Sequence, residues 1–129
     1  TAMAAGGAHS IALKKDGSMI DWGCSPSETR FGECTVPAGL TATAVSAGWY
    51  HSLALKSDGT VVAWGCITSA RHESNNGQCD VPSGLKDVVA ISGGFSHSLA
   101  LKSDGTVVVW GCQNWANWGQ CDVPSELLK

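Results

Sequence analysis

The chain has 129 residues, of which 43% are hydrophobic and 15% are charged, and its formal net charge is −3. This length is enough for one ordinary domain with a single core, and the weak negative charge excludes a basic surface for nucleic acid or an anionic membrane. The apolar runs have the length of β-strands, so none of them is long enough to span a bilayer.

One motif of sixteen residues occurs three times along the chain. The copies are HSIALKKDGSMIDWGC from His9, HSLALKSDGTVVAWGC from His51 and HSLALKSDGTVVVWGC from His97. The second and third copies differ at a single position, and successive copies begin 42 and 46 residues apart. A period of about 40 to 50 residues with strand-like pieces is typical of a propeller or a similar array of sheets.

Each repeat unit is predicted to contain four short strands. The first covers 41–48 in the second unit and 87–94 in the third, and it ends at glycine. The second is the HSLALK segment, in which apolar residues alternate with other residues along the strand. Helix is expected nowhere, except as a turn at 125–129.

The Asp-Gly pair after the second strand predicts a tight hairpin turn. Glycine accepts a positive φ there and aspartate tolerates it, as at Asp58-Gly59. The third strand, 60–65, is apolar on both faces, which is expected of a sheet buried on both sides. The fourth strand, near 78–82, contains proline and therefore fits only an outer edge.

The HSLALKxDGTVxxWG stretch resembles the RCC1-type repeat family, and the resemblance covers essentially the whole chain. It implies an all-β fold, a partial β-propeller of three four-stranded antiparallel blades at 1–40, 41–85 and 86–129. Propellers need at least about four blades to close, so three blades predict an open arc with two apolar end faces. We therefore expect a longer chain, self-association or a protein partner.

Six cysteines recur in pairs, one after the third strand and one before Val-Pro in each unit. The repeat predicts one disulfide per unit, worth about 2–3 kcal/mol each. The predicted pairs are Cys24/Cys34, Cys66/Cys79 and Cys112/Cys121. Reduced thiols and zinc are the alternatives, although structural zinc usually takes four ligands at closer spacing.

Disulfides in turn predict an oxidising compartment. This is either the outside of the cell or the lumen of an organelle such as the ER or the thylakoid. No basic stretch followed by an apolar stretch opens the sequence, so we expect a targeting peptide to be absent or already removed. The sequence contains no Asn-x-Ser/Thr sequon, so glycosylation gives the secretory route no support.

Two sets of repeated side chains are expected to be structural. Each second strand opens with histidine followed by serine, a pattern typical of a hydrogen bond to the neighbouring strand rather than of a metal or acid–base trio. These histidines are His9, His51 and His97. A tryptophan ends each third strand and is expected to pack between blades. These tryptophans are Trp22, Trp64 and Trp110.

Four aromatic residues lie where the repeat does not require them: Trp49, Tyr50, Trp115 and Trp118. They belong to segments that differ between units, and segments at equivalent positions of successive blades gather on one rim. Exposed aromatic side chains anchor protein interfaces and also stack on sugar rings. These four residues are therefore candidates for partner binding, the alternative being that they fold back over their own loops.

The sequence predicts a non-catalytic protein-interaction scaffold, a disulfide-stapled partial propeller that acts as an accessory or structural subunit of a larger complex. A lectin that binds carbohydrate through the loop aromatics is the second hypothesis, and a propeller-type inhibitor of an enzyme is the third. An enzyme is not expected, because no nucleophile, carboxylate pair, Ser-His-Asp set or phosphate loop is recognisable. We expect no catalytic residue, cofactor or metal.

Overall fold

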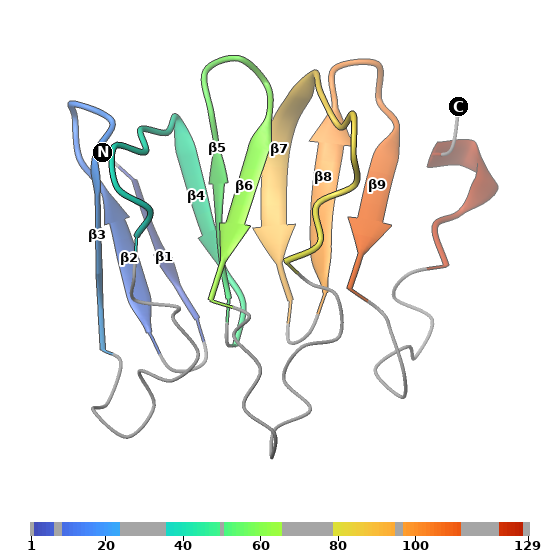
Figure 1. The fold of residues 1–129 in the computed structure, drawn as a ribbon. Helices are drawn as coiled ribbons and strands as arrows, with labels where there is room; N and C mark the ends of the chain where they lie inside the picture. Colours follow the sequence, from blue (N-terminus) through green and yellow to red (C-terminus); the bar gives the residue numbers. More distant parts are fainter. Residues whose placement is uncertain are drawn as a thin grey trace.

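The computed structural model describes residues 2–6, 9–23, 36–49, 51–65, 79–94, 97–111 and 122–127. These residues form three antiparallel sheets, one in each repeat unit (Figure 1). The first sheet contains β1 (Ala2–Ala5), β2 (Ser10–Leu13) and β3 (Met19–Trp22). The second contains β4 (Ala44–Ala47), β5 (Ser52–Leu55) and β6 (Val61–Trp64), and the third contains β7 (Val88–Gly93), β8 (Ser98–Lys102) and β9 (Val107–Trp110). The all-β class predicted from the sequence is confirmed.

Outside the sheets, a short 3-10 helix, η3 (Ser125–Leu127), lies within the predicted turn at 125–129. No helix in the described part of the chain has the length and apolar character of a membrane span.

The Asp-Gly pairs form the hairpin turns between the second and third strands. Gly17, Gly59 and Gly105 have φ values of 86°, 83° and 89°, which glycine adopts without strain. The aspartate has another role, because Asp58 Oδ1 accepts hydrogen bonds from the Thr60 backbone N–H at 3.0 Å and from its hydroxyl at 2.6 Å. These bonds lower the pKa of the Asp58 carboxyl. In the Asp-Gly pair, the glycine therefore adopts the positive φ of the turn, and the aspartate side chain accepts the hydrogen bonds that close it.

The four-stranded detail of the blades is not confirmed, because each sheet has three strands in the described residues. The Val-Pro segments contain no strand pairing, and proline has no N–H to donate to a ladder. After Pro37 and Pro82 the chain turns, with Leu40 N–H donating to Pro37 O and Leu85 N–H to Pro82 O, both at 3.2 Å. The leucines then pack against the cores between the sheets.

The three sheets stand side by side like an open fan, and the core lies between them (Figure 1). Between the first and second sheets, Ile11, Leu13 and Met19 contact the face that carries Trp64. Between the second and third sheets, Leu53 and its neighbours contact the face that carries Trp110. Burying one such aliphatic side chain contributes about 1.5–3 kcal/mol, so these two layers hold the fan together.

Candidate functional site at the ends of the first strands

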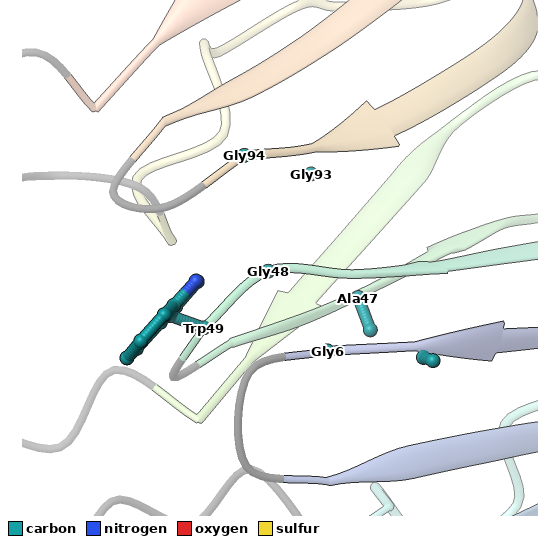
Figure 2. A pocket seen from close by; sticks show the side chains of 7 residues that line it. Gly6, Ala47, Gly48, Trp49, Gly93 and Gly94 are labelled. Carbon is teal, nitrogen blue, oxygen red and sulfur yellow. The ribbon is translucent and has the colours of Figure 1, made fainter.

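An open pocket of about 320 Å³ lies where the first strands of the three sheets end (Figure 2). Its lining residues are Ala5, Gly6, Ala47, Gly48, Trp49, Gly93 and Gly94. Gly48 lies between Gly6 and Gly94, and the Trp49 side chain projects beside it (Figure 2). Trp49 is 45% exposed and is the one large side chain in a lining otherwise made of glycine and alanine.

The glycines of the pocket allow the first strands to approach one another closely. A β-carbon on Gly48 would lie 2.0 Å from Cε1 of His51 and 2.5 Å from the carbonyl oxygen of Gly94. A β-carbon on Gly6 would lie 2.2 Å from the carbonyl oxygen of Gly48. Glycine at these strand ends is therefore required by contact with backbone and with a buried ring, so only a main-chain surface lines this part of the pocket.

The backbone N–H groups of these glycines are not available to a ligand. Gly6, Gly48 and Gly94 donate to the carbonyl oxygens of His9, His51 and His97 at 2.8, 2.8 and 2.9 Å. The lining also contains no charged side chain. The pocket therefore has no cradle for phosphate or another anion, and what it offers a ligand is shape and the indole of Trp49.

The repeated histidines form a hydrogen-bonded ladder next to these glycines, and each bond joins two sheets. His9 Nε2 lies 2.8 Å from Ser52 Oγ, and His51 Nε2 lies 3.0 Å from Ser98 Oγ. The sequence predicted a bond to the neighbouring strand, whereas the observed partner belongs to the next sheet. Both serines are fully buried, so these bonds hold the inter-sheet interface at a fixed register.

The hydrogen bond between His9 and Ser52 continues to a carboxylate. The Ser52 hydroxyl donates to Asp21 Oδ2 at 3.2 Å, so its oxygen accepts from the Nε2–H of neutral His9. In a hydrolase triad the serine is exposed and donates to the histidine. Here the serine is buried and donates to the aspartate, so the set holds two sheets together and presents no nucleophile.

Burial keeps the ladder neutral. It lowers the pKa of His9 and of His97 below the ordinary value of histidine. The pKa of His51 falls furthest, to about 4, because the ring is desolvated and, secondarily, because His9 and His97 lie nearby. At neutral pH none of the three rings is therefore a cationic group, which suits a structural role.

The structure places part of the predicted site. Trp49 lines the pocket, whereas Tyr50, Trp115 and Trp118 lie outside the described residues. Trp64 and Trp110 are 8% and 7% exposed in the two cores, and Trp22 is 50% exposed on the outer face of the first sheet.

Cys79 is the one cysteine among the described residues, and it is disulfide-bonded. The other five cysteines, one of which is its partner, lie outside the described residues: Cys24, Cys34, Cys66, Cys112 and Cys121. In the described part of the chain, no three His, Cys, Asp or Glu side chains gather to hold a metal ion.

Two stretches, 42–69 and 88–114, match the family "Regulator of chromosome condensation (RCC1) repeat". No curated protein matches the chain. Among solved structures, the ectodomain of the Physcomitrella patens receptor kinase CR4 is similar, with 26% identity and a TM-score of 0.67. The ectodomain of the Arabidopsis thaliana receptor kinase ACR4 shares 24% identity with a TM-score of 0.60, and yeast RCC1 (Prp20) bound to Kap60 shares 20% with 0.61.

These three alignments cover 84%, 84% and 85% of this chain. In the same order, the chain spans 28%, 35% and 31% of those proteins. The similarity to ACR4 and to yeast RCC1, both below 25% identity, shows a similar fold and nothing more. The two matched stretches contain every strand of the second and third sheets, and the first sheet repeats their strand order and register. Residues 42–69 and 88–114 are therefore RCC1 repeats, in a chain with the RCC1-like propeller fold.

Proposed function

We propose that this protein is a non-catalytic interaction scaffold that binds a segment of a protein partner in the pocket at the ends of the first strands. The observation that carries the proposal is Trp49, a 45% exposed indole beside a pocket otherwise lined by glycine and alanine. An exposed indole next to a concave, uncharged surface is the arrangement that binding hot spots favour. An extended peptide or a loop fits such a site, because a peptide can be recognised there through shape and contact with the indole, without a charged group in the pocket.

The role of accessory or structural subunit is part of the same proposal. Yeast RCC1, which has the same fold, was solved bound to another protein. The inter-sheet ladder supports a structural role as well, because its buried serine and neutral histidines leave no exposed nucleophile or acid–base pair among the residues that they bring together.

Replacing Trp49 by alanine is expected to weaken peptide binding by about 30-fold, since a tryptophan hot spot contributes about 2 kcal/mol or more. The probe is a set of peptides selected on the wild-type protein from a random display library, with affinities measured by fluorescence anisotropy. Ser83→Asp is the matched control, because Ser83 is exposed and the β-carbon position of its neighbour Gly84 faces open space.

If the selected peptides bind wild type and Trp49→Ala with equal affinity, the pocket is not the peptide-binding site. A glycan array separates the lectin hypothesis from this one. If a glycan binds in a way that depends on Trp49 and no peptide is selected, the protein is a lectin in which the indole stacks on a sugar ring.

We further infer that each unit contains one disulfide, Cys24–Cys34, Cys66–Cys79 and Cys112–Cys121, and that the protein works outside the cell or in an oxidising lumen. The bonded state of Cys79 supports the pairing, and the repeated positions of the cysteines make a bond within each unit the simplest scheme. The similarity to the ectodomain of the Physcomitrella patens receptor kinase CR4 supports the compartment.

Proteolysis without reductant, followed by mass spectrometry, is expected to give three cross-linked peptides, each from a single unit. Reduction and alkylation should then lower the free energy of unfolding by about 2–3 kcal/mol for each bond. Replacing Cys66 and Cys79 together by serine is the matched variant, and it should remove one cross-link and one such increment. Cross-links between units, or three pairs of free thiols, would contradict this scheme.

A further inference from the structure

The glycines around the pocket differ in the use of their N–H groups and of their carbonyl oxygens. Gly6, Gly48 and Gly94 donate their N–H groups to histidine carbonyl oxygens. Gly93 donates its N–H to Ser46 Oγ at 2.9 Å. The carbonyl oxygens of Gly48 and Gly94, in contrast, accept no hydrogen bond from the residues that the structure describes. The glycines therefore offer a ligand hydrogen-bond acceptors and no donors.

These two carbonyl oxygens lie against the glycine of the preceding unit. The Gly94 oxygen is 2.5 Å from the position that a β-carbon on Gly48 would take, and the Gly48 oxygen is 2.2 Å from the corresponding position on Gly6. Each oxygen thus faces the Cα of a glycine, whose C–H groups are weak donors. Because Gly48 and Gly94 both line the pocket, a ligand with stronger donors finds acceptors there.

Trp49 adds an aromatic face at the same place. Its side chain is 45% exposed and projects beside the row formed by Gly6, Gly48 and Gly94 (Figure 2). The face of an indole ring carries partial negative charge and attracts a cation more strongly than the ring of tyrosine or phenylalanine does. The indole and the carbonyl oxygens therefore favour a ligand of the same sign, a positive one.

No positive charge among the described residues of the pocket opposes such a ligand. The lining contains no charged side chain. The ring of His51 lies directly behind Gly48, but it is neutral at pH 7 because burial lowers its pKa to about 4. The chain as a whole has a formal net charge of −3, so a cation is attracted over longer distances as well.

Other classes of side chain fit these groups less well. An apolar side chain would cover the carbonyl oxygens without bonding to them, which costs free energy. A carboxylate would bring negative charge against oxygens and the face of an indole. Lysine and arginine have donors and no acceptor, and the guanidinium of arginine is planar and more weakly hydrated than an ammonium group. A guanidinium can lie flat on an indole while the N–H groups at its edge reach acceptors.

We propose that the pocket binds an arginine side chain of the partner segment. The guanidinium stacks on Trp49, and its N–H groups donate to the carbonyl oxygens of Gly48 and Gly94. The second unit supplies Gly48 and Trp49 and the third supplies Gly94, so the site exists where these two units meet. The inference rests on the proposed function, because it names the side chain that the bound segment inserts.

A double-mutant cycle between the protein and a peptide tests the arginine. The peptides selected on the wild-type protein are expected to share an arginine. Its replacement by citrulline, which has nearly the same shape but no charge, should weaken binding about 10-fold. Trp49→Leu keeps an apolar side chain without an aromatic face, and it should weaken the arginine peptide about 10-fold and the citrulline peptide clearly less. Fluorescence anisotropy measures the four affinities.

Two controls accompany the cycle. Ser83→Asp should leave the effect of citrulline unchanged, because Ser83 is not part of the pocket. Circular dichroism checks that Trp49→Leu is folded, which is expected because the side chain is 45% exposed. The citrulline substitution is made in the peptide, so its effect on binding needs no variant of the protein.

The outcomes separate this inference from the proposed function. If the selected peptides share no arginine, bind equally well with citrulline, or show additive losses in the cycle, the arginine site is wrong, and a loss of affinity in Trp49→Ala still supports the peptide-binding pocket. If no peptide is selected, or if Trp49→Ala has no effect, the proposed function and this inference are both wrong.

Discussion

The Gly48→Ala variant is expected to lose about 3 kcal/mol of the free energy of unfolding, at the upper end of the usual cost of overpacking. The added methyl group would lie 2.0 Å from the His51 ring and 2.5 Å from the backbone of Gly94. Neither neighbour yields easily, because the ring is fully buried and hydrogen-bonded to Ser98 and the carbonyl belongs to the next sheet. The clash of the added methyl group can be relieved only if the second and third sheets move apart, which opens the core between them.

Urea unfolding followed by tryptophan fluorescence measures this loss, and Gly84→Ala is the matched control. Gly84 has a φ of 79° and nothing within 4 Å of the added β-carbon, so its replacement should cost only about 1 kcal/mol of backbone strain. Equal losses in the two variants would show that glycine is needed at Gly48 for chain conformation and not for close approach of the sheets.

Much of the fold could be predicted because the repeat shows the same local signals three times. The Asp-Gly turn, the alternation in the second strand and the apolar third strand each predicted an element that the structure contains. The fourth strand was predicted from the same periodicity, but Pro37 and Pro82 begin turns that send a leucine into the core. Proline is compatible with an edge strand and also with a turn, so the sequence alone does not decide between these two structures.

The candidate site was only partly predictable. Trp49 stood out because the repeat does not require an aromatic residue there, and the structure places it at the pocket. The sequence predicts the glycines beside it only as strand ends, because their role depends on distances between neighbouring sheets, which the sequence of one repeat unit does not give. The recurrence of Gly6, Gly48 and Gly94, each three residues before a ladder histidine, is the signal that would have found the site.

Stability is expected to fall as the pH is lowered from about 6.5 to about 4. The pKa of His51 is about 4 in the folded chain, whereas an unfolded histidine titrates near 6.5. Between these values the unfolded state binds more protons, so stability is fully present above the unfolded pKa and is lost on acidification. The loss amounts to about 3 kcal/mol for this group, and His9 and His97 act in the same direction.

The aspartates of the hairpin turns act at lower pH, which separates the two effects. Hydrogen bonds from Ser18, Thr60 and Thr106 lower the pKa values of Asp16, Asp58 and Asp104, so any stability they contribute is lost only as the pH falls below their ordinary range. Urea unfolding at a series of pH values from 7.5 to 4 measures the histidine effect.

The control for this titration is His51→Gln, which replaces the ring by an amide that does not ionise. This variant should be less stable than the wild type at pH 7, since it loses ring packing, and its stability should change less between pH 6.5 and 4. The two stability curves should therefore converge on acidification. Parallel curves would assign the pH dependence to other groups and would mean that His51 is protonated without cost, which its full burial between two sheets argues against.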